Sequence, residues 1–192
     1  MVYQDMLERI RDGSHWKVLV ADDDEKVREI TEIVLSNVRC LGRPLELLTA
    51  RSGEETVACL RAHPDVVLIL LDVVMETDDA GPVAARRIRN ELGNHLTRIA
   101  VRTGQPGIGN TTDLSQDLAI NSYHEKTDLT ARKLRILVNT GIRSYCELLM
   151  REAAIAGLLT DLKREPDACL YDLAGFLEST LGLSLPADGT RG

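Results

Sequence analysis

Aromatic residues are scarce in this chain of 192 residues, which has one Trp, four Tyr and one Phe. Six rings are too few to build the stacking platforms that hold single-stranded nucleic acid. Positive charge is also in deficit, since the formal net charge is −7 at pH 7. Domains that bind nucleic acid are typically basic. We therefore expect no DNA partner.

Long hydrophobic runs are absent as well. The longest unbroken apolar run, 66–71, has six residues, whereas a membrane span needs about 20. Residues 1–13 (MVYQDMLERIRDG) lack the apolar core of a signal peptide. The cysteines form no CxxC pair, which leaves disulfide and zinc sites weakly supported (Cys40, Cys59, Cys146 and Cys169). We expect a cytoplasmic protein with no membrane contact.

Short apolar segments alternate with segments of helical periodicity. The predicted strands are 17–21, 45–50, 66–71, 98–102 and 121–124, and the predicted helices between and after them are 25–38, 53–63, 82–92, 112–120 and 129–164. Segment 66–71 is apolar on both faces, which is typical of a strand inside a parallel sheet covered by helices. The alternation predicts an α/β domain with a five-stranded parallel sheet and right-handed crossovers.

The chain divides into three predicted segments. Residues 1–15 contain a short amphipathic helix over 3–11, and residues 16–140 form the α/β domain. We expect residues 141–192 to form a helical linker or dimerisation extension, or the start of a truncated second domain.

Polar side chains follow four of the predicted strands. Asp22 and Asp23 follow the first strand, Asp72 the third, Thr103 the fourth and Lys126 the fifth. Ligands of open parallel sheets bind outside the carboxyl ends of the strands, so these residues are expected to meet in one crevice. The run of three acids after the first strand has a simpler interpretation too, as the N-cap of the next helix.

This set of side chains suits phosphoryl transfer. Three neighbouring carboxylates repel one another unless a cation neutralises them, and oxygen-only ligands favour Mg²⁺ or Ca²⁺, of which Mg²⁺ commonly bridges to phosphate. A carboxylate can act as the nucleophile and form an acyl phosphate. A hydroxyl and an ammonium can then contact the phosphoryl oxygens.

Four stretches resemble the receiver domain of two-component response regulators. They are KVLVADDDEKVREI, VVLILLDVVM, RIAVRTG and INSYHEKTD, and the resemblance covers about residues 16–140. It implies a doubly wound, flavodoxin-like sheet with strand order 2-1-3-4-5, followed here by a long C-terminal helical extension. A narrower resemblance, through LLDVVMETDDAG, RTGQPG and YHEKTDLTARKL, is to receivers that precede a sensory-like domain of unknown function. Such relatives often carry a cyclic-dinucleotide phosphodiesterase or a kinase farther on.

The resemblance also implies a role for each site residue. Asp72 would accept the phosphoryl group, and Thr103 and Lys126 would bind it. The acidic pair and the acceptor would hold Mg²⁺ together with the backbone carbonyl of Val74. Tyr123 would be the aromatic residue that couples to Thr103 in switching (the acidic pair is Asp22 and Asp23).

The chain departs from the family pattern at three places. Thr127 stands where the family has a cis proline, and we expect a trans peptide because a non-proline cis bond costs about 3 kcal/mol. Residues 76–79 (ETDD) lengthen the loop after the acceptor and add negative charge. Val74 replaces a polar residue that helps to position hydrolytic water, which predicts slow self-dephosphorylation.

The favoured function is a phosphorylation-controlled signalling switch with protein–protein output. A sensor histidine kinase or a phosphotransfer protein would donate the phosphoryl group, and no turnover of an external substrate is expected. One alternative is a Mg²⁺-dependent phosphatase with an aspartyl nucleophile, although such enzymes need a second acid at the position of Val74. The other is a constitutive interaction domain with an inert site.

The last strong helical pattern, from Leu129 to Arg164, is too long for a receiver's final helix. Its apolar residues alternate spacings of four and three, as in a heptad seam (Leu134, Val138, Gly141, Tyr145, Leu148, Glu152, Ile155, Leu159 and Leu162). This predicts a homodimer through residues 145–164. Alternatively, the first half packs on the chain's own sheet and the second half folds back with residues 168–181, part of a final helix predicted over 167–181.

Overall fold

The computed structural model describes residues 14–104 and 120–164, with side chains described to residue 157. The described strands are β1 (Trp16–Ala21), β2 (Arg39–Cys40), β3 (Arg43–Ala50), β4 (Val66–Asp72), β5 (Arg98–Thr103) and β6 (Ser122–Glu125). The helices are α2 (Glu25–Leu35), α3 (Gly53–Ala62), α4 (Ala80–Asn90) and α6 (Ala131–Arg164), with a short 3₁₀ turn, η2 (Lys126–Asp128). The predicted helices 3–11 and 167–181, and nearly all of 112–120, lie outside the described residues.

The sheet has the strand order β2-β3-β1-β4-β5-β6. The last five are parallel, which confirms the doubly wound α/β fold and the strand order that the resemblance implied. The sixth strand was not predicted. β2 forms a two-residue hairpin with β3, and Leu41 and Gly42 make its turn with φ values of 49° and 80°. Positive φ at both turn residues matches the twist of a tight hairpin.

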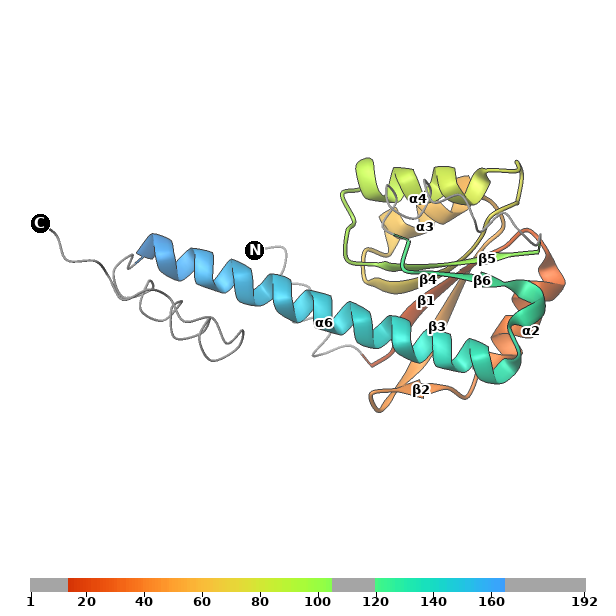
Figure 1. Ribbon diagram of the computed structural model, residues 1–192, viewed down its shortest axis with the longest axis horizontal. Coiled ribbons are helices and arrows are strands. Elements are labelled where there is room, and N and C mark those ends of the chain that lie inside the picture. The colour runs from red at the N-terminus through yellow and green to blue at the C-terminus, as the bar shows by residue number, and fades with distance from the viewer. Residues whose placement is uncertain (1–13, 105–119, 165–192) are drawn as a thin grey trace, which may run out of the picture.

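Helices cover both faces of the sheet (Figure 1), and a hydrophobic core lies on each face. Alternate strand residues supply them, so Leu19 and Ile69 face α3 and α4, whereas Val18 and Leu68 face α2 and α6. Every residue of β4 is buried because helices cover both faces. None of the described helices is long and apolar enough to cross a membrane.

Helix α6 packs on the sheet with its first half and then projects away from it (Figure 1). Its buried side chains are Leu134, Leu137, Val138, Ile142, Tyr145 and Leu149. Gly141 lets the helix approach closely, because a Cβ there would lie 2.9 Å from Leu68 Cδ1. The helix is continuous through residue 141, where the sequence placed a domain boundary.

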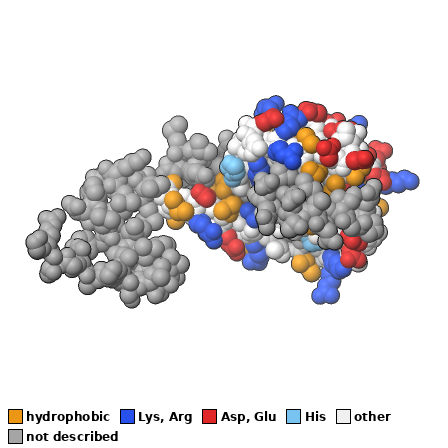
Figure 2. Space-filling view, turned by 45° about the horizontal axis from the view of Figure 1, so that its top comes forward, with side chains coloured by type: hydrophobic (Ala, Val, Ile, Leu, Met, Phe, Trp, Pro, Cys, Tyr) orange, Lys and Arg blue, Asp and Glu red, His pale blue; other side chains and the backbone are white. Residues whose placement is uncertain are grey.

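The described part of α6 corrects the start of the predicted dimer segment. Tyr145 and Leu149 are each 1% exposed and belong to the chain's own core. The helix leaves the domain only beyond Leu149, where Ile155 is 45% exposed. Figure 2 shows hydrophobic and charged side chains together on this projecting part.

Replacing Leu149 tests how far the domain's core extends along α6. Leu149→Ala is expected to lower the free energy of unfolding by about 2–4 kcal/mol, because it leaves a cavity in a packed core. Urea denaturation followed by circular dichroism measures this. Met150→Ala is the matched control on the same helix, since Met150 is 59% exposed. Equal, small effects of the two substitutions would contradict the packing described here.

Candidate functional site

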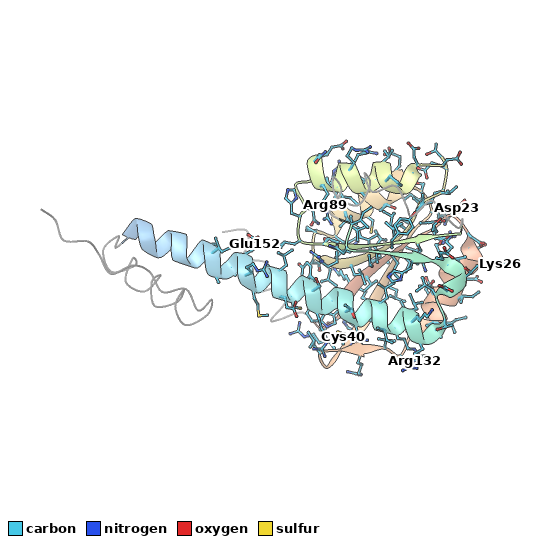
Figure 3. All side chains as sticks on the ribbon, viewed as in Figure 1. Asp23, Lys26, Cys40, Arg89, Arg132 and Glu152 are labelled. Atoms are coloured by element: carbon cyan, nitrogen blue, oxygen red, sulfur yellow. The ribbon has the colours of Figure 1, made fainter. Side chains whose placement is uncertain are left out.

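The carboxyl ends of the parallel strands bring the predicted site residues together. The register pairs Ala21 with Leu71 and Asp72 with Arg102, so Asp22, Asp72 and Arg102 follow one another across the sheet. Thr103 pairs with Glu125, which places Lys126 at the same end of the sheet. Figure 3 shows Asp23 at this end of the sheet, close to the start of α2.

Three carboxylates form an acidic cluster: Asp22, Asp23 and Asp72. Each offers an oxygen, and these oxygens lie within 4.8 Å of one another. Asp22 is fully buried and Asp72 is 4% exposed, whereas Asp23 faces solvent. An all-oxygen donor set with one solvent-facing member fits a hard divalent cation that keeps some of its water. The cluster could therefore hold Mg²⁺.

Lys126 bridges the two buried carboxylates. Its Nζ lies 2.6 Å from Oδ2 of Asp72 and 3.0 Å from Oδ2 of Asp22. Burial by itself lowers the pKa of Lys126, but the hydrogen bonds to Asp72 and Asp22 and their charges outweigh burial and raise it. Burial raises the pKa of Asp72, and the charge of Asp22 adds to this, while Lys126 and the Val73 N–H oppose it. Asp72 is thus a buried carboxylate whose ionised form is disfavoured.

The sequence analysis missed Arg102, a second cation at the cluster. Arg102 is 3% exposed, its Nη2 lies 3.3 Å from Asp22 Oδ2, and its Nη1 donates to Thr31 Oγ1 at 3.0 Å. Burial lowers its pKa, whereas the charges of Asp22 and Asp72 raise it. The available signal was a charged residue directly after the apolar residues 99–101 of β5, in the register of Ala100, which faces α2 and α6.

The two interpretations of the acidic run apply to different residues. Asp24 is the N-cap of α2, and its carboxylate accepts a hydrogen bond from the Lys26 N–H at 2.9 Å. Asp22 instead turns its side chain into the cluster, and its backbone carbonyl accepts a 2.6 Å hydrogen bond from Arg28 Nη1. The helix cap therefore accounts for one acid of the three, and Asp22 and Asp23 remain for the site.

Thr103 and Tyr123 lie together beside Asp72. Thr103 is 1% exposed, and Tyr123 packs against the core on the α3 and α4 side. Burial raises the pKa of the Tyr123 phenol, the neighbouring Thr103 side chain lowers it, and the charge of Asp72 raises it. The phenol oxygen, although close to Thr103, has no described partner at standard hydrogen-bond geometry. The predicted switch pair is therefore adjacent in space.

The loop after Asp72 is held close to the sheet. The Val73 N–H donates to Asp72 Oδ1 at 2.8 Å, and the Gly81 N–H donates to the Val73 carbonyl at 3.0 Å. Gly81 is needed here, because a Cβ would overlap the Asp72 carbonyl oxygen. Val74 is half-buried against the core.

Glu76 lies in the same loop and contacts the start of α3. Both of its carboxylate oxygens accept the Gly53 N–H, at 2.9 and 3.0 Å. Gly53 is the first residue of α3, where free N–H groups favour negative charge. The expectation that the acids of residues 76–79 add to the negative potential of the site stays a prediction. The peptide before Thr127 is trans as expected, since the described residues contain no cis bond.

Comparisons with known proteins identify the fold. No family model matches the chain. A 143-residue stretch, 74% of this chain, is 41% identical to the 3'3'-cGAMP-specific phosphodiesterase 2 of Vibrio cholerae. That stretch is 27% of the relative, so the chain spans about a quarter of the curated protein it matches.

Solved structures show the same arrangement of strands and helices. The signal receiver domain of an HD domain-containing protein from Pseudomonas fluorescens is similar with a TM-score of 0.61 and 18% identity, over 72% of this chain and 94% of that one. The receiver domain of the Francisella response regulator 1452 is similar with a TM-score of 0.54 and 22% identity, over 67% and 98%. These likenesses confirm the fold of a receiver domain.

The raised pKa of Asp72 predicts a pH-dependent stability difference. An acid whose pKa is higher in the folded state than in the unfolded state destabilises the fold once the pH rises above its unfolded pKa. Asp72→Asn removes that charge and nearly keeps the shape. In metal-free buffer at pH 7 it is expected to unfold at a higher temperature than the wild type, and the gap is expected to close as the pH falls.

Thermal melts across that pH range measure the gap. Asp65→Asn is the control, because Asp65 pairs with Lys17 near the opposite ends of the strands. A wild type at least as stable as Asp72→Asn at pH 7 would show that Lys126 compensates fully for the burial of Asp72.

Proposed function

We propose that this chain, which has a receiver fold, is a phosphorylation-controlled signalling module with Asp72 as its phospho-acceptor. The observation that carries the proposal is the position of Asp72, buried at a strand end in contact with Lys126 and within the acidic cluster that it forms with Asp22 and Asp23. The expected donor is a phosphohistidine of a sensor histidine kinase or of a phosphotransfer protein. Output would be through protein contacts.

The proposed reaction is an in-line transfer. An oxygen of the Asp72 carboxylate bonds to phosphorus as the bond from phosphorus to the donor's imidazole nitrogen breaks, and the imidazole keeps that electron pair. The product is an acyl phosphate on Asp72. Bound Mg²⁺, held by Asp22, Asp23, Asp72 and the carbonyl of Val74, would neutralise the phosphoryl oxygens.

The chain's own residues supply the other groups. The Lys126 ammonium, already on Asp72, would contact a phosphoryl oxygen of the product, and the Thr103 hydroxyl would donate to another. Movement of Thr103 would leave space for the Tyr123 ring to turn inward, which is the proposed switch. The apolar side chain of Val74 offers no group to orient water, which favours a long-lived acyl phosphate.

The proposed output follows from the relative. The Vibrio cholerae protein is named for a cyclic-dinucleotide phosphodiesterase activity, and this chain matches about a quarter of it. We place this chain's role in control of such an effector rather than in the hydrolysis itself. The phosphatase alternative is disfavoured, because Val74 stands where a second acid would be needed.

Substitution of the acceptor tests the function. Wild-type protein with acetyl phosphate and Mg²⁺ is expected to gain one phosphoryl group by intact-mass spectrometry, and Asp72→Asn to gain none, because an amide is not a nucleophile. Asp65→Asn, a carboxylate change outside the cluster, is expected to be labelled like the wild type. Labelling of Asp72→Asn, or none of the wild type with either acetyl phosphate or a phosphohistidine donor, would contradict the assignment.

The projecting half of α6 is the proposed dimer contact. Ile155 continues the heptad seam of Leu148 and is 45% exposed. Ile155→Asp is expected to give monomers in light scattering with an unchanged receiver fold, because a charge in the seam opposes association. Met150→Asp is the control, since Met150 is exposed but lies off the seam. A wild type that is monomeric at micromolar concentration, with and without beryllofluoride and Mg²⁺, would contradict the dimer.

A further inference from the structure

Arg102 is a buried cation with no assigned part in the proposed reaction. It stands next to Thr103 in β5, and its guanidinium contacts the carboxylate of Asp22. We propose that Arg102 is a positioning residue that acts as a built-in cation at the acidic cluster, holding Asp22 and lowering the affinity of the unphosphorylated site for Mg²⁺. The inference rests on the proposed function, because it concerns the same metal site.

The surroundings of Arg102 indicate a role beyond packing. Burying a guanidinium is costly unless it is well paired, and Arg102 is 3% exposed with its Nε lacking a described partner. The remaining nitrogens are directed to two groups, Asp22 Oδ2 and Thr31 Oγ1. Thr31 donates its own proton to the Val27 carbonyl at 2.7 Å, so its oxygen is available as the acceptor. An apolar residue, such as Ala100 on the same face, would fill a purely structural position at lower cost.

The charges at the site determine whether Arg102 raises or lowers the affinity for Mg²⁺. An arginine stays protonated in proteins, so its positive charge is permanent. The cluster has three carboxylates, and two cationic side chains, Lys126 and Arg102, contact the two buried ones. Arg102 therefore cancels part of the negative potential that attracts a divalent cation, and it repels the cation itself.

Phosphorylation changes this balance. A phosphoryl group carries close to two negative charges at pH 7, about one more than the carboxylate it replaces. The same permanent charge that weakens metal binding in the resting site offsets the added charge in the phosphorylated one. Lys126 is 23% exposed and can turn to the phosphoryl group, whereas Arg102 is fixed by β5 and Thr31 and stays on Asp22.

Metal titration of the unphosphorylated full chain tests the proposal. Isothermal titration with Mg²⁺, and electron paramagnetic resonance with Mn²⁺, both measure affinity without any phosphoryl transfer. Arg102→Met removes the charge but retains much of the volume, and it is expected to bind either metal about tenfold more tightly. Arg102→Lys keeps the charge and is expected to bind within about twofold of the wild type.

Two further variants distinguish the effect of the charge at Arg102 from other effects of the substitution. Arg98→Met removes the same charge from the same face of β5, four residues and about 13 Å away, and is expected to leave metal affinity unchanged. Arg102→Gln keeps N–H donors for Asp22 and Thr31 without the charge; it is expected to bind metal more tightly, and it replaces Arg102→Met if that variant does not fold. Urea denaturation establishes that each variant is folded.

Different outcomes would overturn the role of Arg102 and the proposed metal site. A folded Arg102→Met or Arg102→Gln with unchanged or weaker metal affinity would overturn the inference, since it would show that Arg102 only supports the structure. If Arg102→Lys bound as tightly as Arg102→Met, charge would not be the cause. A wild type that bound neither metal would overturn the proposed metal site itself, and with it the inference.

Discussion

Burial of two carboxylates at adjacent strand ends is the constraint on which the rest of the site depends. Asp22 and Asp72 are almost fully withdrawn from water, and burial together with the charge of Asp22 raises the pKa of Asp72. Such a pair is stable only where cations meet it. The fold supplies Arg102 from β5 and Lys126 from the turn after β6, and it leaves Asp23 open to solvent. The balance stops short of neutrality, which is the condition for a site that takes up a further cation.

Most of this site follows from the sequence because strand ends are easy to locate. Asp72 directly follows the apolar run 66–71 and Lys126 directly follows the short strand β6, and a parallel sheet brings such positions to one edge whatever their separation along the chain. Arg102 did not follow from this reasoning, because a charged residue at a strand end normally faces water. Its burial depends on Asp22 and Thr31, from β1 and α2, which no local pattern in β5 reveals.

The same limit of local sequence patterns explains where the observed fold differs from the predicted one. Gly42 and Pro44 suggest a break, and only pairing with β3 makes Arg39–Cys40 a strand. Heptad spacing in α6 is equally compatible with a partner helix and with the chain's own sheet, since both contacts use one face of the helix. Gly141 lies close against Leu68 of the sheet, and the ring of Tyr145 is buried in the core. The chain's own packing therefore covers the apolar side of α6 as far as Leu149.

The packing of α6 also connects the site to the projecting end of that helix. Arg102 contacts Thr31 on α2, and α2 contacts α6 through a 3.3 Å hydrogen bond from Arg135 Nε to the Val34 carbonyl. Helix α6 is continuous for 34 residues, about 51 Å at 1.5 Å per residue. A small rotation where it packs on the sheet therefore becomes a larger displacement at its projecting end. A continuous helix that begins five residues after Lys126, a contact of Asp72, and ends outside the domain is a direct structural link between the site and the projecting end.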